Sequence, residues 1–226
     1  TAQVFNPMAS EYSATRNHHL LKGLMLRSTR LTLVIALPVI ASFSILGEKF
    51  IELWMGPEYA VDAAAVLLIL ALTQILSSPH NSIASILYGI GNHKNRAFMR
   101  IGERISNVIL SVILVKPFGI VGVALGTAIP HTIIIGIALP LYSCKLLGIN
   151  WKDYIKESLT GPLINILPFL LGGWIINSYF PPESLLSFFF LIALLCILYM
   201  FTGYYPCLNK EERLIVNRKL VQLRNR

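Results

Sequence analysis

Six long apolar runs, separated by short polar segments, set the pattern of this chain. The runs cover residues 31–47, 63–88, 99–117, 119–147, 159–179 and 185–202. A helix rises ~1.5 Å per residue, so about 20 residues cross the ~30 Å hydrocarbon core of a bilayer. The pattern therefore predicts an all-α fold: a polytopic membrane helix bundle with six transmembrane helices in residues 31–203.

The two flanks of these runs are polar and basic. Residues 1–30 predict the end of a missing helix followed by a cytoplasmic-side segment. Residues 204–226 place an apolar side beneath several arginines and lysines, which is typical of a basic amphipathic tail on anionic membrane lipids. The chain begins at Thr1 without a basic and apolar signal pattern, so we expect it to be part of a longer protein.

Composition and charge support a membrane protein and predict its orientation. The chain is 55% hydrophobic and 13% charged, against about 25% charged in soluble domains. If the spans alternate, one side holds every Lys and Arg except Lys49 and Lys116. By the positive-inside rule that side, with both chain ends, is cytoplasmic. Topology thus accounts for the net charge of +8, and we expect no nucleic-acid partner.

One predicted helix, residues 63–88, carries a stripe of uncharged polar residues. Gln74, Ser78, Asn81 and Ser85 are spaced by four, three and four, which places them on one helical face. Such a face avoids lipid. Two interpretations stay open: hydrogen bonds that hold helices together, or the lining of a cavity for hydroxyl-rich ligands. Pro79 predicts a kink in this helix.

The next predicted helix repeats the stripe with charges. Arg100, Glu103, Arg104, Asn107 and Ser111 share one face. In one interpretation the arginines snorkel to the headgroups and Glu103 neutralises a neighbour. In the other they face a central cavity and attract an anionic substrate, since guanidinium groups suit phosphate oxygens.

Histidines and glycines add further candidates. His80 follows Pro79 and His131 follows Pro130, and each is either a neutral buried histidine or part of a proton relay. His131 has no carboxylate nearby in the sequence. Gly122 and Gly126 have the small-xxx-small spacing of close helix packing. We find no metal-ligand spacing, cofactor motif or catalytic constellation, so the sequence does not predict an enzyme.

Four short motifs carry a family resemblance. They are NP with SE at 6–7 and 10–11, LWMGPEY at 53–59, YGIGN at 88–92 and FGIVGVA at 118–124. In order and spacing they resemble the C-terminal portion of the Wzx-type O-antigen and capsule polysaccharide flippases. Those transporters belong to the multidrug/oligosaccharidyl-lipid/polysaccharide exporter superfamily.

The resemblance implies a function and a partner set. The chain would form roughly the C-terminal half of a MATE-like two-lobe transporter in a bacterial cytoplasmic membrane. The transporter would move an undecaprenyl-pyrophosphate-linked oligosaccharide by alternating access, for surface polysaccharide and lipopolysaccharide biosynthesis. Its partners would be that substrate, membrane lipids and the missing N-terminal lobe of the same polypeptide.

The resemblance also suggests roles for particular residues. Arg100 and Arg104 would attract the diphosphate, whereas Gln74, Asn81 and Asn107 would bind sugar hydroxyls. A proton relay would use His80 and Glu103. The alternatives are a multidrug/cation antiporter of the same superfamily, a membrane-bound enzyme of polysaccharide assembly, and a scaffold that does not transport.

Overall fold

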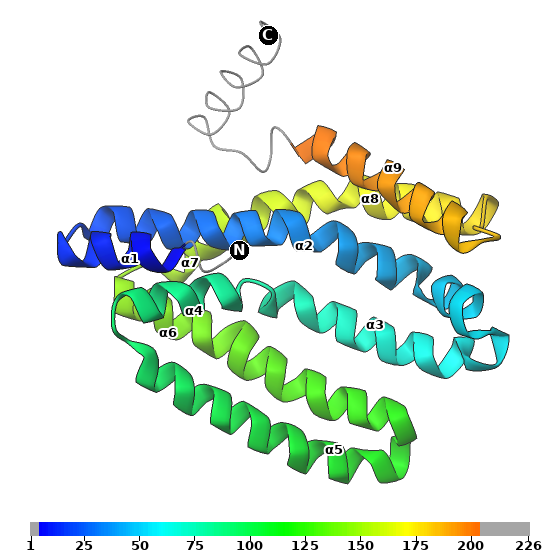
Figure 1. Cartoon of the computed structure of the whole chain (residues 1–226), viewed down its shortest axis with the longest axis horizontal. Helices are drawn as coiled ribbons and strands as arrows, with labels where there is room; N and C mark the ends of the chain where they lie inside the picture. Colours follow the sequence, from blue (N-terminus) through cyan, green and yellow to red (C-terminus); the bar gives the residue numbers. More distant parts are fainter. Residues whose placement is uncertain (1–4, 204–226) are drawn as a thin grey trace, which may run out of the picture.

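The computed structural model describes residues 5–203, all of whose elements are helical (Figure 1). The predicted tail at 204–226 lies outside the described residues. In chain order the elements are α1 (Phe5–Ala14), α2 (His18–Met55), η2 (Pro57–Tyr59), α3 (Ala60–Ser77), α4 (His80–Gly89), α5 (His93–Pro130), η3 (His131–Ala138), α6 (Leu139–Leu147), α7 (Trp151–Tyr154), η4 (Ile155–Leu159), α8 (Thr160–Tyr179) and α9 (Leu185–Gly203).

Within residues 5–203, five helical segments are long and apolar enough to cross a membrane, where the sequence predicts six. They are His18–Met55, Pro57–Gly89, His93–Leu147, Trp151–Tyr179 and Leu185–Gly203. The difference lies in the predicted spans 99–117 and 119–147, which fall inside one continuous helical segment of 55 residues.

That long segment reverses direction at Gly119. The glycine has φ 55° and ψ −134°, a conformation foreign to a right-handed helix, and Pro117 just before it cannot donate a backbone hydrogen bond. A Cβ built on Gly126 would lie 2.5 Å from the backbone nitrogen of Ser111, and one on Gly122 would overlap the carbonyl of Leu114. The two arms of α5 therefore pack against each other as a hairpin (Figure 1).

Helix α2 is the central support of the bundle. It contacts α1, α3, α8 and α9, and its buried Leu33 and Leu37 belong to the main apolar core. The sequence predicts a polar segment to residue 30 and a helix from residue 31. The structure instead has one helix of 38 residues, capped by Asn17, whose side chain accepts from the Leu20 amide. At ~1.5 Å per residue it is about 57 Å long, so its basic N-terminal half extends beyond the hydrocarbon layer.

Pro79 divides the second predicted span as expected. Helix α3 ends at Ser77 and α4 begins at His80, because the proline lacks the amide proton that would continue the ladder. A second irregularity follows Pro130, where η3 is a wide π-helical stretch. The break at Pro79 lies beside His80 and the π-helical stretch begins at His131, so each irregularity positions one of the two candidate histidines.

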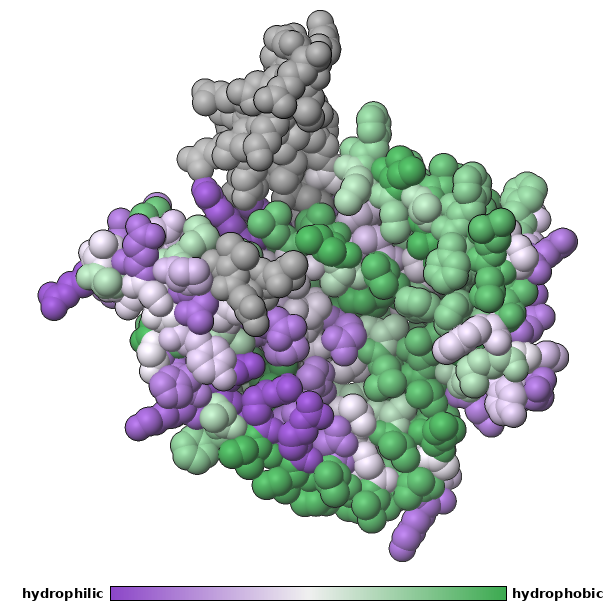
Figure 2. All heavy atoms as spheres, viewed as in Figure 1, coloured by the Kyte–Doolittle hydropathy of each residue, from purple (hydrophilic) through white to green (hydrophobic). Residues whose placement is uncertain are grey.

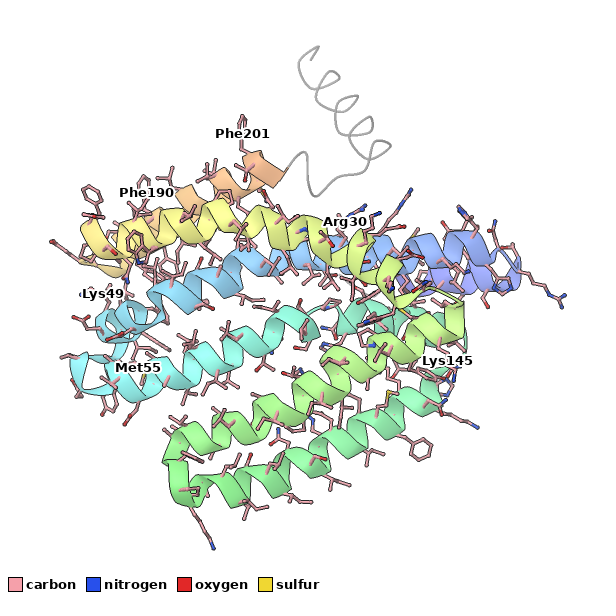
Figure 3. The ribbon with its side chains drawn as sticks, turned by 180° about the vertical axis from the view of Figure 1, so that it is seen from behind. Arg30, Lys49, Met55, Lys145, Phe190 and Phe201 are labelled. Atoms are coloured by element: carbon pink, nitrogen blue, oxygen red, sulfur yellow. The ribbon has the colours of Figure 1, made fainter. Side chains whose placement is uncertain are left out.

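The surface of the described residues suits a lipid environment. Figure 2 shows hydrophobic residues along the outer side of α5 and around α8 and α9, with hydrophilic residues gathered at the end that holds α1. Phe190 and Phe201 on α9 point away from the bundle and are 68% and 83% exposed (Figure 3). Lys145 lies at the α1 end and Lys49 at the opposite end (Figure 3).

Candidate functional site

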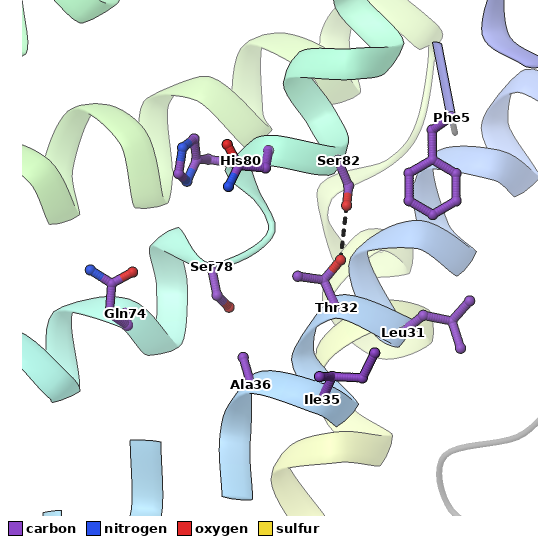
Figure 4. A pocket seen from close by; sticks show the side chains of 10 residues that line it. Phe5, Leu31, Thr32, Ile35, Ala36, Gln74, Ser78, His80 and Ser82 are labelled. Atoms are coloured by element: carbon purple, nitrogen blue, oxygen red, sulfur yellow. Dashed lines mark hydrogen bonds between the residues drawn. The ribbon is translucent and has the colours of Figure 1, made fainter. Parts of the chain in front are cut away.

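A cavity of about 520 Å³ opens between α2 and the break that separates α3 from α4. Three residues of the predicted amide and hydroxyl stripe line it: Gln74, Ser78 and Asn81. The fourth, Ser85, is not among the lining residues and donates to the Asn81 carbonyl within its own helix (3.0 Å). Other lining residues are Phe5, Leu31, Thr32, Ile35, Ala36, His80 and Ser82 (Figure 4).

The cavity has a polar side and an apolar side. Amide and hydroxyl groups come mainly from the α3–α4 break, whereas Leu31, Ile35 and Ala36 come from α2. Ile35 is 70% exposed, so the α2 edge is open at the surface of the described chain. In Figure 4, Ser78 points toward Ala36 across the space, and the Thr32 and Ser82 hydroxyls meet at one side.

The Thr32–Ser82 contact joins the two walls. Their hydroxyl oxygens lie 2.8 Å apart, and Thr32 Oγ1 also lies 2.8 Å from the Ser28 carbonyl. A carbonyl can only accept, so Thr32 donates to Ser28 and the Ser82 hydroxyl donates to Thr32. This bond fixes α2 against α4 where the cavity begins.

A double-mutant cycle tests this junction. The full-length parent is the longer protein of which we expect this chain to be a part. We expect Ser82→Ala to lower its free energy of unfolding by about 1 kcal/mol, because one hydrogen bond is lost, and Thr32→Val by about 2 kcal/mol, because the bond to Ser28 is lost as well. The double variant should lose less than the sum, since both changes remove the same contact. Denaturant unfolding in detergent micelles measures the values. Strictly additive losses would contradict a direct bond.

The His80 imidazole connects the cavity to a second polar cluster. Its Nδ1 lies 2.8 Å from the Ser77 carbonyl, so Nδ1 carries a proton and donates there. The ring centroids of His80 and His131 are 6.1 Å apart at an interplanar angle of 83°. His80 is thus a lining residue that also contacts the start of η3.

Glu103 is the centre of that second cluster, and its side chain is fully buried. His131 Nδ1 lies 3.1 Å from one carboxylate oxygen. Arg104 Nε and Arg100 Nη1 lie 3.4 and 3.7 Å from the other. A buried carboxylate is costly unless it is paired, and here the pairing comes from both arms of the α5–η3 hairpin.

Asn107 continues the charged stripe into the hairpin. Its side-chain oxygen accepts from Ser111 Oγ at 3.2 Å and from Thr127 Oγ1 at 3.5 Å. The same two hydroxyls also approach the Val123 carbonyl. Asn107 therefore takes part in contacts between the two arms.

The structure brings together only part of the predicted site. Gln74, Asn81 and His80 share the cavity, whereas Arg100, Arg104 and Asn107 are not among its lining residues. The arginines approach Glu103 instead, and the Arg104 side chain remains 63% exposed.

Sequence reasoning missed two features of the site. The carboxylate partner of His131 is Glu103, 28 positions away on the other arm. Thr127 and His131 are four positions apart, so they share one helical face, and they follow the closely spaced Gly122 and Gly126. This pattern was the available sequence signal for a polar contact across the hairpin. The second feature is Thr32, whose run of apolar neighbours gives no sign that it lines a cavity.

A comparison with known proteins shows what this chain is similar to. Over 132 residues, 58% of this chain, the sequence is 26% identical to the probable low-salt glycan biosynthesis flippase Agl15 of Haloferax volcanii. The chain is similar to a glycan flippase. The match covers 28% of that relative, so the chain spans well under half of its length. No protein-family model and no solved structure matches the chain.

The cavity offers groups that can form hydrogen bonds to a ligand. Its polar groups are amides, hydroxyls and one imidazole. Across residues 5–203, no group of three or more His, Cys, Asp or Glu side chains is placed to hold a metal ion. An open, mostly apolar cavity with amide and hydroxyl groups on one side suits a ligand that has both hydroxyl groups and apolar faces.

Proposed function

We propose that this chain is part of a membrane flippase that moves a lipid-linked oligosaccharide across the cytoplasmic membrane during glycan biosynthesis. The observation that carries the proposal is the cavity lined by Gln74, Ser78 and Asn81 within a bundle of long, predominantly apolar helices. Similarity to a probable glycan biosynthesis flippase supports the same function. The proposed cargo is an undecaprenyl-pyrophosphate-linked oligosaccharide, and the proposed mechanism is alternating access.

We further propose a topology of six crossings. Each arm of the His93–Leu147 hairpin is long enough to cross the bilayer, and Gly119 would lie at the surface opposite α1. With the basic end cytoplasmic, the described lobe would be roughly the C-terminal half of a MATE-like transporter. The missing N-terminal lobe would then face the open α2 edge of the cavity.

Within this proposal Arg104 attracts the diphosphate. Its side chain is 63% exposed and lies about three helical turns from the cytoplasmic start of α5. Arg100 is 29% exposed and also approaches Glu103, so it contributes less directly.

A translocation assay tests the function. We expect the full-length parent in proteoliposomes to move a lipid-linked oligosaccharide, and Arg104→Gln to lower the initial rate about tenfold, because one charge-assisted hydrogen bond of ~1.5–3 kcal/mol is lost. Lys94→Gln serves as a control, because Lys94 is exposed at the first turn of the same helix. An intact parent that moves no lipid-linked glycan would overturn the proposed function.

A second candidate is a cation or drug antiporter, favoured by the buried Glu103 beside His131 and His80. A carboxylate that exchanges protons is what such a transporter needs. The two functions separate in the same vesicles: an antiporter would move protons in exchange for a lipophilic cation, and lipid-linked glycan would not compete.

A further inference from the structure

We infer that the cavity is a subsite for an uncharged pyranose unit of the cargo, and that the charged parts of the cargo bind elsewhere. The inference rests on the proposed flippase function and adds which part of the glycolipid this lobe holds. It starts from the chemistry of the lining residues: none of those within residues 5–203 is Lys, Arg, Asp or Glu.

The absence of charge from the lining decides against an ionic ligand. A charged group that leaves water for an apolar bundle needs a counter-charge or several hydrogen bonds. The cationic groups of the neighbouring cluster are directed to Glu103, with Arg100 Nη1 at 3.7 Å and Arg104 Nε at 3.4 Å. A diphosphate or a uronate in the cavity would therefore have to compete with Glu103 for Arg100 and Arg104.

The available hydrogen-bonding groups match sugar hydroxyls. Asn81 and Gln74 are exposed on helices whose neighbouring surface includes Leu72 and Leu76, at 49% and 37% exposure. An amide facing lipid would be unfavourable, so these two face a ligand or water. The side-chain amide of Asn107 has hydrogen-bond partners within the protein, since Ser111 and Thr127 donate to its oxygen inside the hairpin.

The shape of the cavity matches a pyranose as well. A sugar ring has a rim of hydroxyl groups and apolar C–H faces, and the cavity has amides on one side with Leu31, Ile35 and Phe5 on another. Its volume of about 520 Å³ lies within the ~300–1,000 Å³ of small-molecule sites. A lipid tail would leave the amides unpaired, and a fully polar ligand would leave the α2 side without a partner.

The experiment compares two synthetic probes on the full-length parent in proteoliposomes. Both are undecaprenyl-diphosphate disaccharides, one ending in glucose and the other in glucuronic acid. Each competes with the cargo extracted from cells that lack the parent. We expect the concentration of probe that halves cargo transport to be at least about tenfold lower for the glucose probe than for the glucuronic acid probe. A tenfold difference corresponds to ~1.4 kcal/mol of binding free energy.

Variants at Asn81 connect this preference to the cavity. Asn81→Leu should weaken competition by the glucose probe about tenfold, the loss expected for one or two hydrogen bonds. Asn81→Lys should shift the preference toward the glucuronic acid probe, because it adds a counter-charge. Ser85→Ala is the matched control, since Ser85 lies one turn further along α4 and bonds within its own helix.

The outcomes separate the two proposals. If the parent fails to move the extracted cargo, the flippase function is wrong. If it moves that cargo but competition does not depend on probe charge or on Asn81, the flippase function stands and the sugar subsite is overturned. A glucuronic acid preference in the intact parent would also overturn the subsite.

Discussion

Replacing Glu103 with Ala should lower the free energy of unfolding of the full-length parent by about 3–5 kcal/mol, the cost of breaking a buried ion pair. The fully buried carboxylate lies within 3.7 Å of nitrogens from Arg100, Arg104 and His131. Without it, the partly buried Arg100 loses the negative charge that compensates it, and the partly buried His131 loses its hydrogen-bond acceptor. Denaturant titration of the purified parent in detergent measures the loss.

Two further variants define the cause of this effect. Glu103→Gln preserves the shape and an acceptor for His131 but removes the charge, so its loss should be smaller than that of Glu103→Ala. Glu58→Ala is the control for removing a carboxylate, since Glu58 is exposed in η2, and we expect a change within ~0.5 kcal/mol. Equal stability of Glu103→Ala and the intact parent would contradict the pairing role.

Replacing Gly126 with Val should destabilise the hairpin by about 3 kcal/mol or more, at the upper end of overpacking effects. A Cβ there would lie 2.5 Å from the Ser111 backbone nitrogen, and a backbone atom cannot move aside as a flexible side chain can. The arms would separate, and the Asn107 and Glu103 contacts across them would weaken together. The same denaturant titration measures the loss.

Gly102 on the same helix provides the matched control. A Cβ at Gly102 meets nothing within 4 Å, so Gly102→Ala should raise stability by up to about 1 kcal/mol through helix propensity. If both substitutions lower stability equally, the effect is a general intolerance of α5. If neither does, the hairpin does not depend on close contact at Gly126.

Hydropathy and helical periodicity predict much of this fold. They placed the apolar runs, and Pro79 marked the break between α3 and α4. They also placed Gln74, Ser78 and Asn81 on one face, because residues spaced by three and four share a face in any helix. The sequence did not predict that α2 continues through its basic N-terminal half, since charged residues fit a helix beyond the bilayer as well as a loop.

The candidate site was less accessible to sequence reasoning. Periodicity shows which residues share a face but does not show what that face meets. The Arg100 and Arg104 stripe was therefore compatible with snorkelling to the headgroups or with a cavity, and the structure directs both residues to Glu103. His131 is 28 positions from Glu103, and only the reversal at Gly119 brings them together.

The reversal at Gly119 also bears on how the protein is made. The first arm alone does not supply all the partners of Glu103 and Asn107, because His131 and Thr127 lie on the other arm. The first arm would thus wait beside the translocon until the ribosome has synthesised the second, and the two would enter the bilayer as a pair. In nascent chains that end before Thr127, the first arm should therefore still crosslink to the translocon.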